Sequence, residues 1–237
     1  MSLASSASPR GAGRPHFQEE LAGLEHSTLD GIDLVLEQID RTVEALRHQD
    51  VELSSLVIGD DDRIDGRYLE VHQGILSLLA RQAPVAGDLR LVAALLHTIK
   101  HIERIGDQCV NICKLLPLCG NEPPTVPDVL ELVLRMGTLA RSEVAQSKLA
   151  FANRDATLAE DLVRQDREIN TLQRDIFRRA IEIGEDPDIR EWAMTMTLVA
   201  RCFERIGDNA VDIGEQTAFV VTGLFREFSD SRTDGAA

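Results

Sequence analysis

The sequence Glu103-Arg104-Ile105-Gly106-Asp107 occurs a second time in the chain, as Glu204-Arg205-Ile206-Gly207-Asp208. The copies lie 101 residues apart, and the likeness continues through Val110-Asn111-Ile112 in the first and Val211-Asp212-Ile213 in the second. A repeat of about 100 residues is too long for a solenoid unit and long enough for a small helical bundle. The chain is therefore predicted to contain the same domain twice.

Apolar residues recur at helical spacing along most of the chain, and no segment alternates with period 2 for more than a few residues. An aromatic content of 4% also suits packed helices better than a β-sandwich. The sequence predicts an all-α fold of six long helices in two tandem three-helix bundles, spectrin-like and up-down. The predicted helices cover residues 17–49, 51–83, 86–116, 128–153, 155–183 and 188–228.

Composition sets the domain boundaries. Residues 1–15 are rich in Ser, Ala, Gly and Pro and are predicted to form a disordered tail. The stretch 119–127 contains three prolines, which cannot continue a helix and make a semi-rigid linker. We therefore expect three-helix repeats at 16–118 and 128–228, followed by a flexible tail at 229–237.

The charge and cysteine content exclude several classes of function. The formal net charge of −15 repels phosphate backbones, so we expect no nucleic-acid partner and favour cations or basic protein surfaces. Four cysteines without a CxxC pair indicate a reducing cytoplasm. No apolar run is long enough to span a membrane. No nucleophile–base pair or nucleotide motif is present, so we expect no enzyme.

The first copy of the motif predicts a site for a cation. On a helical wheel Glu103, Asp107 and Asn111 face away from the apolar side. If the preceding helix returns antiparallel from a corner near residue 84, Asp61 and Asp65 come level with Asp107 and Glu103. Oxygen ligands converging from two helices suit Mg²⁺, Ca²⁺, Mn²⁺ or iron, with Zn²⁺ as a further alternative.

The second copy predicts an equivalent site. Glu204, Asp208 and Asp212 face outward on the wheel. With a corner near residue 186, Asp166 and Asn170 come level with Asp208 and Glu204. This copy has an amide where the first has a second carboxylate, so its site is expected to be weaker or to hold a different number of ions.

Two simpler readings compete with the metal hypothesis. Acids on the outside of a helix are usually just solvated, but here like charges at i and i+4 occur twice beside a mid-helix glycine, and both features cost helix stability. His97 and His101 have the spacing of a zinc pair, yet no third ligand is evident, and we expect a half-buried structural role. A purely structural bundle would contain no ion.

Three segments resemble the PhoU family of phosphate-uptake regulators. They are the duplicated ERIGD motif with its following Val-Asn-Ile, the corner LARQAPVAGDLRL at residues 79–91, and the closing FVVTG at residues 219–223. The resemblance runs from about Phe17 to Phe225. Along the preceding helix it is weaker, because Gly66, Arg67 and Tyr68 depart from the family pattern.

The resemblance implies a cytoplasmic, dimeric, metal-binding regulator. PhoU-like proteins carry metal clusters, in some members of iron, on acidic motifs that match Glu103 and Asp107 with Asn111, and Glu204 and Asp208 with Asp212. They restrain the phosphate-specific ABC transporter and hold the phosphate-sensing histidine kinase in its off state. The expected function is negative regulation of phosphate uptake and of two-component signalling. The alternative is a helical metal-storage or metal-dependent redox protein that uses the same acidic sites.

Overall fold

The computed structural model describes residues 13–120 and 126–228. The predicted tails therefore lie outside the described residues at 1–12 and 229–237, as does the middle of the predicted linker at 121–125. Residues 13–15, which we expected in the N-terminal tail, belong to the first helix.

The described residues are almost entirely helical and contain no strand, which confirms the all-α prediction. The first repeat consists of α1 (Gly13–His48), α2 (Val51–Asp60), α3 (Asp62–Arg81), α4 (Ala86–Leu115) and a short 3₁₀ helix, η1 (Leu116–Cys119). The second consists of α5 (Pro127–Asn153), α6 (Ala156–Glu160), α7 (Leu162–Glu182) and α8 (Pro187–Thr222). Within the described part of the chain, none of these helices is both long and apolar enough to cross a bilayer.

The middle helix of each repeat is divided, where the sequence predicted a continuous one. In the first repeat α2 and α3 meet at Asp61, and in the second α6 and α7 meet at Asp161. Asp61 follows Gly59 in a run of three aspartates, a composition that favours competing local hydrogen bonds over helix. The Asp161 carboxylate is held by Arg164, with N–O distances of 2.8 and 3.0 Å.

The last helix ends at Thr222 rather than near Phe228 as predicted. Gly223 has a φ of 75°, and its amide donates to the carbonyl of Phe219 at 2.9 Å. This left-handed conformation caps the helix and directs the chain away from its axis.

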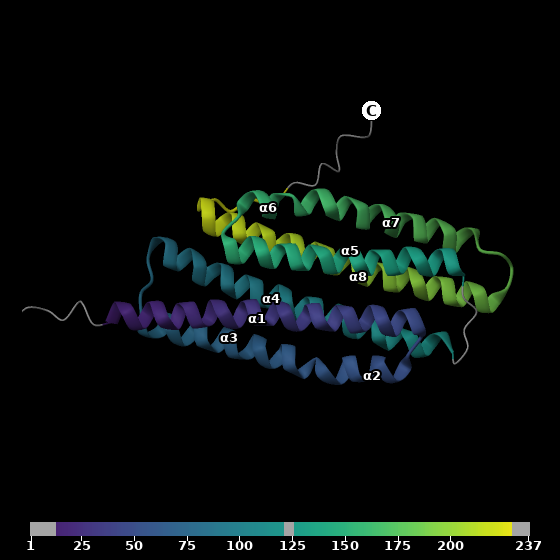
Figure 1. The fold of residues 1–237 in the computed structure, drawn as a ribbon, viewed down its shortest axis with the longest axis horizontal. Helices are drawn as coiled ribbons and strands as arrows, with labels where there is room; N and C mark the ends of the chain where they lie inside the picture. Colours follow the sequence, from purple (N-terminus) through teal and green to yellow (C-terminus); the bar gives the residue numbers. More distant parts are fainter. Residues whose placement is uncertain (1–12, 121–125, 229–237) are drawn as a thin grey trace, which may run out of the picture.

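The two repeats lie side by side with their long axes nearly aligned, and they meet along two seams (Figure 1). In one seam α4 packs against α8, and in the other α1 packs against α5. The second seam combines close packing with ion pairs. A methyl group on Gly137 would lie 2.7 Å from Val43, and Arg141 binds the Asp40 carboxylate through two nitrogens at 2.6 and 3.0 Å.

The cap at Gly223 predicts a specific stability change. The variant Gly223→Ala should lower the free energy of unfolding by about 1 kcal/mol, because an alanine methyl is strained in the left-handed region. In a chain of this size that corresponds to a fall of roughly 2–4 °C in the unfolding midpoint, measurable by circular dichroism.

The matched control is Gly23→Ala, a substitution inside α1 where a methyl would meet nothing within 4 Å. It should leave the midpoint unchanged or raise it, because alanine favours helix over glycine. Equal midpoints for the two variants would show that the cap does not constrain Gly223.

Candidate metal centre

Each repeat brings five oxygen-bearing side chains together from three of its helices, and we name these groups centre one and centre two. Centre one consists of Gln38 of α1, Asp61 at the junction of α2 and α3, Asp65 of α3, and Glu103 and Asp107 of α4. Centre two consists of Glu143 of α5, Asp166 and Asn170 of α7, and Asp208 of α8. We include Glu204, which stands one helical turn before Asp208 on α8 at the position equivalent to Glu103. Each set contains four carboxylates and one amide.

Centre one is built around the bare backbone of Gly106. A methyl group on this residue would lie 2.9 Å from Oδ1 of Asp61 and 3.3 Å from Oε1 of Gln38. Nε2 of Gln38 donates to the same Asp61 oxygen at 3.0 Å. Any side chain in place of Gly106 would therefore push these groups out of the centre.

The carboxylates of centre one are close enough to disturb one another. Burial is the main cause that raises the pKa of Asp61, and the charges of Asp65, Asp107 and Glu103 raise it further. Burial likewise raises the pKa of Asp107, with added contributions from Glu103 and Asp65. Nζ of Lys100 binds Oε2 of Glu103 at 2.6 Å. A bound cation would relieve this mutual repulsion.

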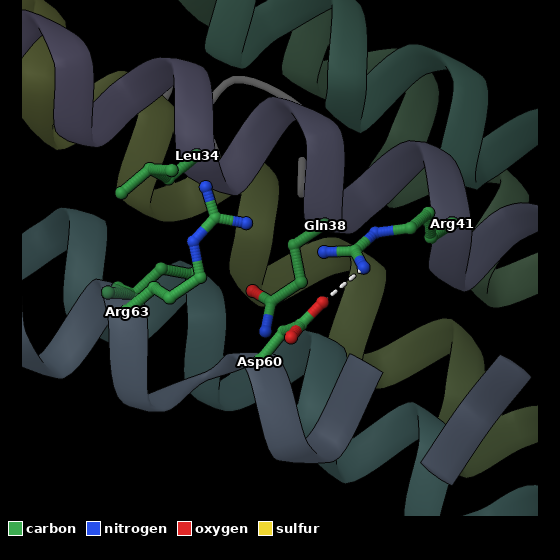
Figure 2. A pocket seen from close by; sticks show the side chains of 6 residues that line it. Leu34, Gln38, Arg41, Asp60 and Arg63 are labelled. Atoms are coloured by element: carbon green, nitrogen blue, oxygen red, sulfur yellow. Dashed lines mark hydrogen bonds and ion pairs between the residues drawn. The ribbon is translucent and has the colours of Figure 1, made fainter. Parts of the chain in front are cut away.

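A small polar pocket borders centre one. Figure 2 shows the Gln38 side chain between the guanidinium groups of Arg41 and Arg63. Arg41 forms an ion pair with Asp60, and this hydrogen bond is the main cause that lowers the pKa of the Asp60 carboxyl. Of the adjacent aspartates, Asp60 thus binds the flanking arginine, whereas Asp61 faces the centre.

Centre two is built in the same way around Gly207. A methyl group here would lie 2.9 Å from Oε2 of Glu143 and 3.0 Å from Oδ1 of Asp166. Glu143 is only 1% exposed. No hydrogen-bond donor in the described part of the chain contacts either of its carboxylate oxygens. A fully buried carboxyl group with no donor is rare, because its charged form loses hydration without compensation.

The surroundings of Glu143 favour its protonated form. Burial, together with the charges of Asp166 and Asp208, raises the pKa of its carboxyl to about 9. Nδ2 of Asn170 donates to Oδ2 of Asp166 at 2.6 Å, and Arg201 forms an ion pair with Glu204. Without a cation, Glu143 is therefore neutral near pH 7.

Two predicted site residues, Glu204 and Asp212, are oriented differently from the prediction. Glu204 does not face outward, since it is only 5% exposed. Asp212 contacts His101 at 3.3 Å in the seam between α4 and α8, where Oδ1 of Asn209 also lies 2.9 Å from the imidazole. The helical wheel predicted the wrong orientation because α8 packs against α4, α5 and α7, and therefore has more than one buried side. Asn111 is exposed one turn beyond the other acids of α4.

The histidine pair does not form a zinc site. His101 is half-buried and binds side chains of α8, as the expected structural role requires, whereas His97 is exposed. Burial is the main cause that lowers the pKa of His101, which favours its neutral form.

Sequence reasoning missed the third helix of each centre. Gln38 and Glu143 lie on the buried faces of α1 and α5, and they are separated by 105 residues, as are Asp61 and Asp166. The available signal was a long polar side chain inside an apolar stripe, repeated at the spacing of the domain. That spacing differs from the 101 residues of the motif itself, so a search at one fixed offset does not find it.

The donor chemistry of both centres fits a hard or borderline cation, because every candidate ligand atom is a carboxylate or amide oxygen. In the conformation described for residues 13–120 and 126–228, no three His, Cys, Asp or Glu side chains are grouped so that they could hold a metal ion. Two of the acids are instead paired with Lys100 and Arg201. Binding of an ion would thus require these side chains to turn.

Comparisons with known proteins agree with the duplicated architecture. The family model for the PhoU domain matches residues 30–116 and again residues 133–217. The phosphate-specific transport system accessory protein PhoU homologue of Clostridium acetobutylicum is 28% identical over 219 residues, covering 92% of this chain and 99% of its own. The homologue of Aquifex aeolicus is 31% identical over 188 residues, covering 79% and 84%.

Two crystal structures show the same fold. The phosphate transport system regulatory protein PhoU of Streptococcus pneumoniae superposes with a TM-score of 0.80 at 26% identity, covering 89% of this chain and 99% of that one. PhoU of Pseudomonas aeruginosa gives 0.78 at 28% identity, covering 88% and 100%. On the match of both repeats, this chain belongs to the PhoU family.

Proposed function

We propose that this protein is a metal-binding accessory regulator of a phosphate-specific transport system. Its relatives are named as accessory or regulatory proteins of that system, and they match it over nearly their whole length. In this proposal the chain acts at the cytoplasmic side as a homodimer. It restrains the ABC transporter and holds the phosphate-sensing histidine kinase off, without catalysing a reaction itself.

The observation that carries the metal part of the proposal is Glu143. Its carboxyl is buried, lacks a hydrogen-bond donor in the described chain, and lies against Gly207 beside a second carboxylate. In its charged form this buried group would need a partner. A cation would supply one, and it would convert the repulsion among the neighbouring acids into attraction.

The candidate ligands differ in accessibility between the centres. Centre two would hold its ion with Glu143, Asp166, Glu204 and Asp208 and the amide oxygen of Asn170. Centre one would use the equivalent set from Gln38 to Asp107, of which Asp65 and Asp107 are exposed. Iron is the expected metal from the family, and Mn²⁺, Mg²⁺, Ca²⁺ or Zn²⁺ are alternatives. The more exposed centre one should exchange its ion faster.

The adaptor role fits the surface of the chain. A net charge of −15 favours association with basic protein surfaces and disfavours nucleic acid. Within the described residues no catalytic constellation accompanies the acidic centres, and Cys109 is buried with its thiol pKa raised by burial. In this proposal the side chains of the chain serve ion binding and partner recognition.

A pull-down tests the regulatory function. Tagged protein from phosphate-replete cells should capture the transporter ATPase subunit and the histidine kinase, identified by mass spectrometry. Deleting the gene should raise phosphate uptake in rich medium. Capture of neither partner together with unchanged uptake would contradict the regulatory role, and substrate turnover by bound iron would favour the redox alternative.

The pKa of Glu143 predicts a pH dependence of stability in protein treated with a chelator. Between the ordinary pKa of 4.5 and the folded value of about 9, the folded chain holds a proton that the unfolded chain has released. The free energy of unfolding therefore falls as pH rises through this window. From pH 6 to pH 9, wild type should lose on the order of 4 kcal/mol more than Glu143→Gln, whose amide does not titrate.

Urea unfolding at the two pH values measures this difference. The same Glu143→Gln variant should bind Mn²⁺ more weakly, because a neutral amide replaces a charged ligand. Parallel pH profiles for the two proteins would mean that Glu143 titrates at an ordinary pKa.

Gly207→Ala separates metal binding from folding. The new methyl would lie 2.9 Å from the carboxylate of Glu143 and 3.0 Å from that of Asp166, and it would push both away. Because these are the ends of flexible side chains, and alanine favours helix by about 1 kcal/mol, stability should be kept. Mn²⁺ affinity, measured by isothermal titration calorimetry, should fall about tenfold or more. Gly23→Ala is the control, and an unchanged affinity in both variants would exclude Gly207 from the site.

A further inference from the structure

A basic side chain stands three residues before the motif glutamate in both repeats. Lys100 binds Glu103 in the first, at an N–O distance of 2.6 Å, and Arg201 binds Glu204 in the second. The two basic residues are 101 residues apart, the same spacing as the motif. Equivalent contacts at equivalent positions are a property of the repeat and not an accident of one helix.

These contacts differ from ordinary surface ion pairs in the burial of their acids. The side chain of Glu204 is 7% exposed and that of Glu103 is 18% exposed, whereas Arg201 and Lys100 are 51% and 41% exposed. The cationic groups thus reach in from the solvent side to carboxylates that water hardly reaches. In the first repeat, the ring of Tyr68 lies 5.1 Å from the Lys100 nitrogen and helps to orient it.

A second observation that points to a ligand lies beside each motif glycine. Glu143 in centre two and Gln38 in centre one are each only 1% exposed. In the described chain, both oxygens of Glu143 and Oε1 of Gln38 have no hydrogen-bond donor. Oε2 of Glu143 and Oε1 of Gln38 lie 2.9 and 3.3 Å from the position of a methyl on the motif glycine, so they point into the centres.

We infer that Lys100 and Arg201 are resident counter-cations, which neutralise the motif glutamates of the empty centres and are displaced when a metal ion binds. The inference rests on the metal binding proposed above. On loading, the N–O contact of each pair breaks, the glutamate oxygen turns to the ion, and the ammonium or guanidinium group returns to solvent. No covalent bond changes in either centre. In centre one a cation replaces a cation, and in centre two Glu143, which is neutral without an ion, also releases its proton to solvent.

The displacement has two opposite consequences for the molecule. The basic residues stabilise the metal-free centre, because they offset the repulsion among its charged carboxylates. They also weaken metal binding, because the ion must compete with a cation that is already tethered to the chain. Removing them should therefore lower the stability of the empty protein and raise its metal affinity.

The experiment compares Lys100→Met and Arg201→Met with wild type. Methionine keeps much of the apolar stem and removes the charge. In Mn²⁺ titrations after chelator treatment, each variant should bind about 2- to 5-fold more tightly than wild type at the altered centre, the competition expected of one partly exposed ion pair. The unfolding midpoint of the metal-free protein should fall by roughly 1–4 °C, while that of the loaded protein should not.

Matched controls remove the same charge elsewhere. Arg178→Met breaks an i, i+3 pair with Asp175 at 3.0 Å on α7, and Lys148→Met breaks the pair with Asp33 at 2.5 Å. Neither should change Mn²⁺ affinity. The charge-preserving variants Lys100→Arg and Arg201→Lys should behave like wild type.

Equal affinities in wild type, Lys100→Met and Arg201→Met would overturn the inference, and so would equal gains in the controls. A wild-type chain that binds no Mn²⁺ and no iron would contradict the metal proposal itself. In that case the unfolding midpoints of the metal-free proteins still test the counter-cation role. The substitution Arg201→Met must lower the midpoint more than Arg178→Met does.

Discussion

Repulsion between carboxylates that share a confined space is the constraint on which this structure depends. In each repeat acidic groups gather beside the motif glycine, and burial raises the pKa of Asp61, Asp107 and Glu143. Such an arrangement is unfavourable unless something compensates it. The chain supplies two kinds of compensation in the described state. Amide groups donate to the aspartates, and basic side chains approach the glutamates from solvent.

The scaffold keeps this arrangement in place because α1 and α5, the first helix of each repeat, serve two purposes. On α1, Gln38 reaches centre one while Asp40, two residues on, binds the other repeat. On α5, Arg141 receives that contact while Glu143, two residues on, reaches centre two. Residues two apart on a helix point to nearly opposite sides. The helices that join the repeats therefore also provide the innermost oxygen of each centre.

The sequence was sufficient for those features that depend on one helix or one hairpin. Equal distances from a corner correctly placed Asp61 beside Asp107, and the duplicated motif predicted the duplicated bundle. It was insufficient wherever a third helix determines how a side chain is oriented. The wheel placed Glu204 outside because it could not include α5, and it could not show that Asp212 meets His101 of the other repeat. The breaks in the middle helices could not be predicted from the apolar pattern, because they depend on competition between local hydrogen bonds and helical hydrogen bonds.

The divided middle helices also make the two halves of the molecule unequal. Asp61 stands at the junction itself, whereas the corresponding break in the second half falls at Asp161, upstream of Asp166, which lies within the continuous α7. A residue at a junction has backbone freedom that a residue inside a helix lacks. The aspartate that lies beside the motif glycine thus stands at a helix end in the first repeat and inside a helix in the second, so the same side-chain position has a different backbone freedom in the two halves.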